Sequence, residues 1–125
     1  MTVHLTEGER SHDGELTAAI STAMVQIVRD YTGRGPTKAR TTIRDSVVLV
    51  ILEDTLTRGE RALVAYGKED KVLDIRLDFQ DAMRDEAMQT VAQLTGCAVL
   101  AMMSASHIEP DFGAKVFVLD GAPTR

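Results

Sequence analysis

Cysteine, long apolar runs and positive charge are all scarce in this chain of 125 residues. The single cysteine, Cys97, cannot form a disulfide within the chain, and the small apolar residues beside it predict a buried thiol. No apolar run approaches the roughly 18 residues that a membrane-spanning helix needs. The sequence therefore predicts a protein with no internal disulfide and no direct membrane insertion.

Acidic residues outnumber basic ones by 19 to 14, which gives a net charge of -5 at pH 7. Such a charge repels phosphate backbones, so nucleic acid is excluded as a general partner. The first residues are polar and acidic and lack the basic and apolar regions of an export signal. We therefore expect a cytoplasmic protein.

The length suits one domain, and the apolar fraction of 44% and charged fraction of 26% are typical of globular proteins. We expect a flexible tail over residues 1–13, one domain over 14–120 and a second tail over 121–125.

Periodicity and stop signals predict seven elements. Apolar residues at helical spacing run from Glu15 to Tyr31, and Gly33 follows as a stop signal. Thr57 and Glu60 match a capping box at the start of a short helix. The predicted helices are 15–31, 58–66 and 70–94, and the predicted strands are 39–44, 47–53, 98–106 and 114–119.

The predicted order is αββααββ, with strands paired into hairpins instead of alternating singly with helices. This order favours an α+β fold of two layers, with a mainly antiparallel four-stranded sheet. In strand 47–53, successive apolar residues point to opposite faces, so both faces need cover. Small antiparallel α+β domains usually place their helices on one face, and we therefore predict a homodimer that covers the other.

The one local concentration of positive charge is the segment from Gly33 to Arg40. Arginine side chains and loop amides suit anions, which makes this segment a candidate site for a small anion. The alternative is structural, with glycines that end the helix and basic side chains that pair with the acidic stripe of a neighbouring helix. The candidate anion-binding residues are Arg34, Gly35, Pro36, Lys38 and Arg40.

A second candidate lies in the loop after strand 98–106, where His107 precedes Glu109 and Asp111. These residues are weak candidates for a metal site or a proton shuttle, because no second histidine or cysteine completes a zinc set. A simple turn is the alternative. No nucleophile motif is present, so we expect neither an enzyme nor a bound cofactor.

Two charged residues, Arg76 and Glu86, fall near the apolar arc of the helix predicted at 70–94. Either a buried ion pair with other groups or an outward-reaching side chain fits this position.

Four segments together resemble the MpsC-type family. They are RDYTGRGPTKAR at 29–40, LEDTLTRGE at 52–60 and the pair SASH and VFVL at 104–107 and 116–119. The resemblance covers about residues 14–120, and its most specific part is Gly-Arg-Gly-Pro.

The resemblance implies a small bacterial protein, named for a Na⁺-translocating membrane-potential-generating system whose membrane subunits are linked to uptake of dissolved inorganic carbon. We therefore expect a non-enzymatic dimeric accessory or regulatory protein, with a membrane transport subunit as a partner. The alternative is a cytosolic small-anion sensor that uses the Gly-Arg-Gly-Pro loop.

Overall fold

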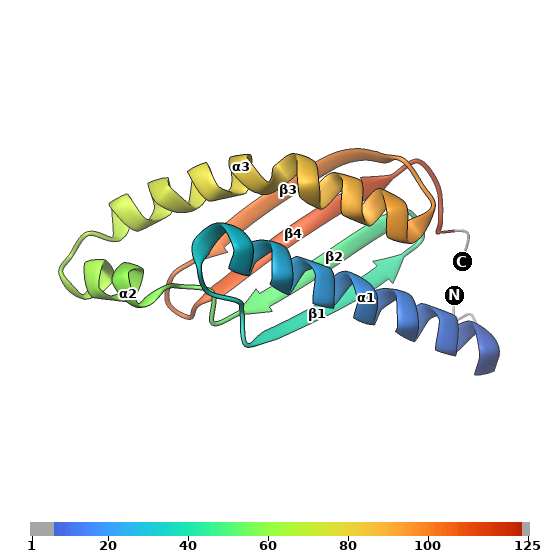
Figure 1. Cartoon of the computed structure of the whole chain (residues 1–125), viewed down its shortest axis with the longest axis horizontal. Coiled ribbons are helices and arrows are strands. Elements are labelled where there is room, and N and C mark those ends of the chain that lie inside the picture. The colour runs from blue at the N-terminus through green and yellow to red at the C-terminus, as the bar shows by residue number, and fades with distance from the viewer. Residues whose placement is uncertain (1–6, 124–125) are drawn as a thin grey trace.

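The structure is a computed structural model that describes residues 7–123, with side chains described from residue 14 (Figure 1). Its elements follow the predicted order αββααββ. They are α1 (Glu7–Thr32), β1 (Lys38–Arg44), β2 (Val47–Glu53), α2 (Arg58–Ala65), α3 (Glu69–Thr95), β3 (Val99–His107) and β4 (Phe112–Leu119).

The four strands form one antiparallel sheet in the order β1-β2-β4-β3. Helices α1 and α3 lie side by side across one face of this sheet, and α2 packs against α3 beyond the end of the strands (Figure 1). The α+β class and the two-layer antiparallel architecture are thus confirmed, as is the placement of the long helices on one face.

The main core lies between the helix layer and the sheet. Alternate residues of β2 and β4 point into it, so Val48, Val50 and Phe117 are fully buried. Helix α1 contributes Ile20 and Met24, and Cys97 is buried nearby as predicted.

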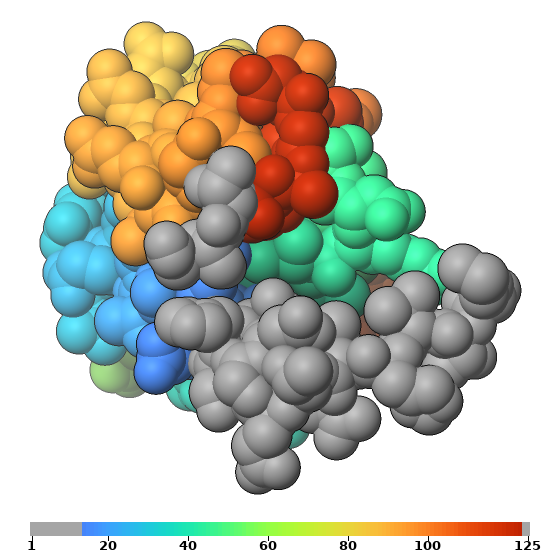
Figure 2. Space-filling model, turned by 90° about the vertical axis from the view of Figure 1, so that its right-hand side faces the viewer, coloured from blue at the N-terminus to red at the C-terminus, as the bar shows by residue number. Residues whose placement is uncertain are grey.

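The opposite face of the sheet has no helix over it among residues 7–123; we call it the open face. Seen from the end of the molecule in Figure 2, the blue and orange helices form one side and the green and red strands the other. Apolar side chains occupy the open face on the other three strands of the sheet, β2, β4 and β3. They are Val47, Leu49 and Ile51 of β2, Ala114, Val116 and Val118 of β4, and Ala101, Met103 and Ala105 of β3.

Helix α1 begins at Glu7, eight residues before the predicted start at Glu15, so it extends into the segment 1–13 that was predicted to be a tail. Residues 7–13 are polar and show no apolar periodicity, but they contain no proline to stop a helix. Residues 1–6 of the predicted tail lie outside the described residues, as do residues 124 and 125 at the other end.

The short elements match their predictions closely because strong local signals bound them. Thr57 accepts a hydrogen bond from the Glu60 amide at 3.1 Å, and Glu60 accepts one from the Thr57 amide, which confirms the capping box. Gly33 and Gly96 follow the ends of α1 and α3 with positive φ angles of 84° and 73°. Within residues 7–123, no helix has the length and apolar content needed to cross a bilayer.

Candidate functional site

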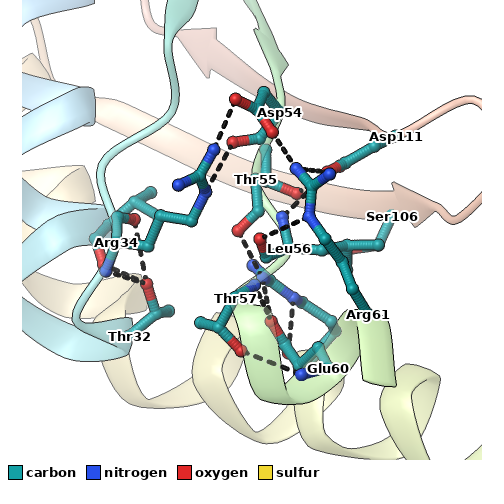
Figure 3. A network of polar contacts seen from close by, with 12 residues as sticks. Thr32, Arg34, Asp54, Thr55, Leu56, Thr57, Glu60, Arg61, Ser106 and Asp111 are labelled. Atoms are coloured by element: carbon teal, nitrogen blue, oxygen red, sulfur yellow. Dashed lines mark hydrogen bonds and ion pairs between the residues drawn. The ribbon is translucent and has the colours of Figure 1, made fainter. Parts of the chain in front are cut away.

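Polar side chains from four segments meet at the end of the sheet where β2 stops (Figure 3). Arg34 comes from the loop after α1, and Asp54 follows β2 directly. Arg61 lies on α2, and Asp111 lies in the loop between β3 and β4. We call this group the polar network.

Asp54 lies at the centre of the exposed half of the polar network. Its backbone takes a left-handed conformation, with φ at 60°, and its carboxylate forms ion pairs with both Arg34 and Arg61. Arg34 Nε also donates to the backbone oxygen of Asp54 at 3.3 Å. The hydrogen bond from Arg34 lowers the pKa of the Asp54 carboxyl below 3.8, and the two guanidinium charges lower this pKa further.

Asp111 connects the β3–β4 loop to the start of α2. Its carboxylate accepts the Thr55 hydroxyl at 2.7 Å and the Leu56 amide at 2.9 Å. Arg61 lies 3.6 Å from the same carboxylate. Two loops that are distant in the sequence are therefore held together by one side chain.

The buried half of the polar network is the ion pair between Arg76 of α3 and Glu60 of α2. Both side chains are nearly inaccessible, at 6% and 7% exposure. Arg76 Nε donates to Glu60 at 2.9 Å, and its terminal nitrogen donates to the Thr55 carbonyl at 2.6 Å. The buried ion pair considered for Arg76 is confirmed, whereas Glu86 is exposed and accepts the Tyr31 hydroxyl at 3.0 Å.

The charges of the polar network balance, with three arginines against three carboxylates. Each carboxylate already accepts hydrogen bonds or ion pairs from within the chain. Such a group stabilises the loops at this end of the sheet, because its polar side chains find their partners within the chain.

The five residues predicted to bind an anion do not converge on one point. Arg34 is held by Asp54, and Pro36 is buried. Gly35 lies against the Arg29 guanidinium, which is 2.9 Å from where a β-carbon would stand. Lys38 and Arg40 are exposed on β1, beyond the loop. An anion at Arg34 would have to compete with Asp54. Arg34 thus pairs with an acidic residue, as in the structural alternative, but this residue follows β2 and is not part of the acidic stripe of a helix.

The loop residues considered for metal binding point apart. His107 Nδ1 donates to the Pro110 carbonyl at 2.7 Å, Glu109 is exposed, and Asp111 turns into the polar network. Over the described part of the chain, no three histidine, cysteine or acidic side chains are grouped to hold a metal ion.

Comparison with known proteins gives one match. A family model described as "Na+-translocating membrane potential-generating system (MpsC)" matches residues 12–121, which is most of the chain. The chain belongs to the MpsC family. No curated protein and no solved structure shows a significant match. Membership of the MpsC family associates the chain with a membrane-potential-generating system, and the polar network lies wholly within the matched residues.

The open face of this MpsC family member is hollowed at one end. A concavity of about 430 Å³ lies there, and its lining includes Arg40 of β1, Ile51 of β2, and His107 and Phe112 of the β3–β4 hairpin. Arg40 is therefore the one predicted anion-binding residue that lines a hollow of the open face.

A residue that sequence reasoning missed, Lys115, lies on the helix-facing side of β4 and is only 4% exposed. Burial lowers its pKa to about 8, and the nearby charges of Arg76 and Arg84 lower it in the same direction. The strand pattern held a signal for this position, because Lys115 alternates in phase with the buried Phe117 and Leu119.

Proposed function

We propose that this MpsC family member is a cytoplasmic, non-enzymatic accessory protein of the membrane-potential-generating system, and that it acts as a homodimer paired through its open face. The observation that carries the proposal is the apolar open face. Apolar residues continue across it from β2 through β4 to β3, as in the row Leu49, Val116 and Met103. A continuous apolar patch on a sheet favours a protein partner.

The position of the charges on the open face favours a second copy as that partner. Its cations, Lys38, Arg40 and Arg44, all lie on β1 at one edge, whereas β3 at the other edge carries Ala101, Met103 and Ala105. A two-fold axis parallel to the strands places β1 of one copy over β3 of the other. The cationic edges then lie far apart, and each meets an uncharged edge.

The size of the open face also fits self-pairing. Four strands about 4.8 Å apart, each contributing about seven residues, give a flat footprint of about 440 Å² per copy. Two copies therefore cover about 900 Å² of footprint, and protruding side chains add to this area. With that addition the total approaches the roughly 1,000–1,200 Å² at which specific interfaces begin.

The polar network supports a non-enzymatic role, because its carboxylates are engaged by arginines and backbone amides. Cys97 is buried, and its thiol faces the carbonyls of Thr95 and Ala122, so it is no accessible nucleophile.

Light scattering during size exclusion tests the dimer. We expect the wild type to elute as a dimer at micromolar concentration. Leu49→Lys and Val116→Lys each bury an unpaired charge in the proposed interface, so each variant should elute as a folded monomer. Gln89→Lys is the matched control, since it adds the same charge to the exposed side of α3 and should leave the dimer intact. A monomeric wild type would overturn the proposed pairing.

The accessory role needs a separate measurement. The tagged chain is co-expressed with the multi-span transport subunit of the system and purified in mild detergent. We expect the subunit to co-purify with the wild type and with Gln89→Lys. Failure to co-purify, with a dimer present, would reject the accessory role and leave the dimer standing.

The alternative function, a small-anion sensor at the Gly-Arg-Gly-Pro loop, stays a prediction. Arg40 is a better candidate than Arg34 for binding the anion. Arg40 is exposed and lines the hollow of the open face, whereas Arg34 pairs with Asp54. Calorimetry with bicarbonate, phosphate and nucleotides tests it. Saturable heat that Arg40→Ala abolishes would support it, and no heat from any of these anions would reject it.

A further inference from the structure

A buried lysine without a counter-charge lies beneath α3. Lys115 occupies the row of β4 that faces the helices, between Gly113 and Phe117. Its neighbours across the sheet are Val50 on β2 and Ser104 on β3, and neither carries a charge. Lysine is rarely buried so deeply unless an opposite charge accompanies it.

The charges close to Lys115 are positive. Among side chains from residue 14 to residue 123, no carboxylate forms an ion pair with Lys115. The charged groups whose fields reach it are Arg76 and Arg84 of α3. Glu60 neutralises Arg76, whereas the Arg84 guanidinium donates to the Met102 carbonyl. The region therefore holds an excess of positive charge.

A cavity adjoins Lys115 between α3 and the β3–β4 hairpin. The centre of a water molecule can occupy a volume of about 20 Å³ in this cavity, so the cavity has room for one water molecule or one small ion. Its polar lining includes Arg76, Gln80 and Ser106 as well as Lys115. A groove of about 270 Å³ along the β3 side of α3 shares Arg76, Gln80 and Ser106 with the cavity, so the two lie next to each other.

One hydroxyl in the cavity is arranged to donate. Gln80 Nε2 donates to Ser106 Oγ at 2.9 Å, so the serine hydrogen remains available for another acceptor. A lysine ammonium beside a serine hydroxyl makes a pair of donors suited to an anion.

We propose that the cavity between α3 and the β3–β4 hairpin binds a small monovalent anion the size of chloride or nitrate. The Lys115 ammonium supplies the opposite charge, and the Ser106 hydroxyl donates a hydrogen bond. The size follows from the cavity, which has no room for a phosphate ester or a nucleotide. This site is separate from the Gly-Arg-Gly-Pro loop and does not depend on the homodimer.

Thermal unfolding of the full chain at pH 7 tests the site. Sodium nitrate or sodium chloride replaces sodium gluconate at constant ionic strength, because gluconate is too large for the cavity. We expect both small anions to raise the midpoint of unfolding saturably, by mass action on the folded state. Nitrate is the more decisive of the two anions. Its general effect on proteins is to lower the midpoint of unfolding, so a rise in nitrate indicates binding to the folded protein.

Two variants assign the effect to the cavity. Lys115→Met should abolish the saturable rise in nitrate and leave only the general destabilising effect of that anion. Ser106→Ala should raise the nitrate dissociation constant by about tenfold. Lys71→Met, at an exposed lysine on α3, is the matched control and should respond as the wild type does. Equal midpoints in nitrate, chloride and gluconate would overturn the proposal, as would a saturable rise in nitrate that survives in Lys115→Met.

Discussion

Arg76 and Glu60 bury opposite charges at the contact between α2 and α3, and each stabilises the other's charge. Replacing one partner alone leaves the other charge buried and unpaired, at a cost of about 3–5 kcal/mol. We therefore expect Arg76→Met and Glu60→Leu each to lower the free energy of unfolding by about this amount. The double variant should lose less than the sum, and urea denaturation of the four proteins in a double-mutant cycle measures the coupling.

Arg58→Met is the control for this cycle, because Arg58 is exposed on α2. Its effect should stay within about 0.5 kcal/mol. Additive losses in the double variant would show that the two charges do not stabilise each other.

Asp54 gives a second prediction for a single side chain. Its carboxyl has a lowered pKa, chiefly because Arg34 donates a hydrogen bond to it. Arg34→Gln should therefore raise the pKa of Asp54 toward 3.8, and an NMR titration of the side-chain carboxyl carbon measures the change. A lowered pKa stabilises the fold above the unfolded-state value and loses this effect as pH falls through the folded-state value. An unchanged pKa would mean that Arg61 alone holds the carboxylate.

At the scale of single elements, β4 carries the clearest pH dependence. The folded-state pKa of Lys115 is about 8, against 10.5 for a free lysine, so the unfolded chain binds the proton more tightly between these values. The contribution of Lys115 to stability should then rise with pH from about 8 to about 10.5, by about 3 kcal/mol in total. Arg76 and Arg84 on α3 face this lysine and stay charged throughout, and Glu60 lies behind Arg76.

Lys115→Met removes this linkage. In gluconate buffer the variant should be more stable than the wild type at pH 7, and its advantage should shrink by about 3 kcal/mol as the pH approaches 10.5. Urea denaturation at several pH values measures both curves. Parallel curves for the two proteins would show that Lys115 keeps an ordinary pKa in the fold.

The elements were predictable because their signals are local. One end of each helix carries such a signal: a capping box at Thr57 and Glu60 begins α2, and Gly33 and Gly96 follow α1 and α3. The helices begin or end at these residues in the structure, as the sequence predicts. The start of α1 was missed because Glu7 and its neighbours give no apolar pattern, and because Gly8, Ser11 and Asp13 among them are poor helix formers.

The polar network was harder to predict, because its partners are distant in the sequence. Arg34 meets Asp54 across 20 residues, and Thr55 meets Asp111 across 56. Sequence spacing indicated that Arg76 falls near an apolar arc, but only the packing of α2 on α3 supplies Glu60 as its partner. Lys115 was missed because a lysine in a short strand is normally taken as facing solvent.

At the scale of the whole molecule, the two faces of the sheet have different roles. The helix layer covers one face with a core that includes Ile20, Met24 and Phe117. The other face leaves a half-buried apolar surface on the inner strands and cations on the β1 edge. Apolar residues on both faces of β2 were visible in the sequence, whereas the confinement of the cations to one edge follows from the strand order β1-β2-β4-β3.

The direction of the proposed two-fold axis is testable by cross-linking. Thr42 of β1 and Met103 of β3 share one row of the open face, at opposite edges about 14 Å apart. An axis parallel to the strands places Thr42 of one copy over Met103 of the other, whereas a perpendicular axis in the sheet plane places β1 over β1. In a Cys97→Ala background, a mixture of Thr42→Cys and Met103→Cys chains should cross-link with a short bismaleimide. Thr42→Cys chains alone should not.

Cross-linking of Thr42→Cys chains to each other would instead indicate the perpendicular axis, in which the cationic β1 edges of the two copies lie together. Arg40 and Arg44 would then repel their counterparts, and such a dimer should tighten with added salt. The parallel axis predicts a dimer held by apolar contacts, with little dependence on ionic strength. Sedimentation at low and high salt therefore distinguishes the two arrangements independently of the cysteine variants.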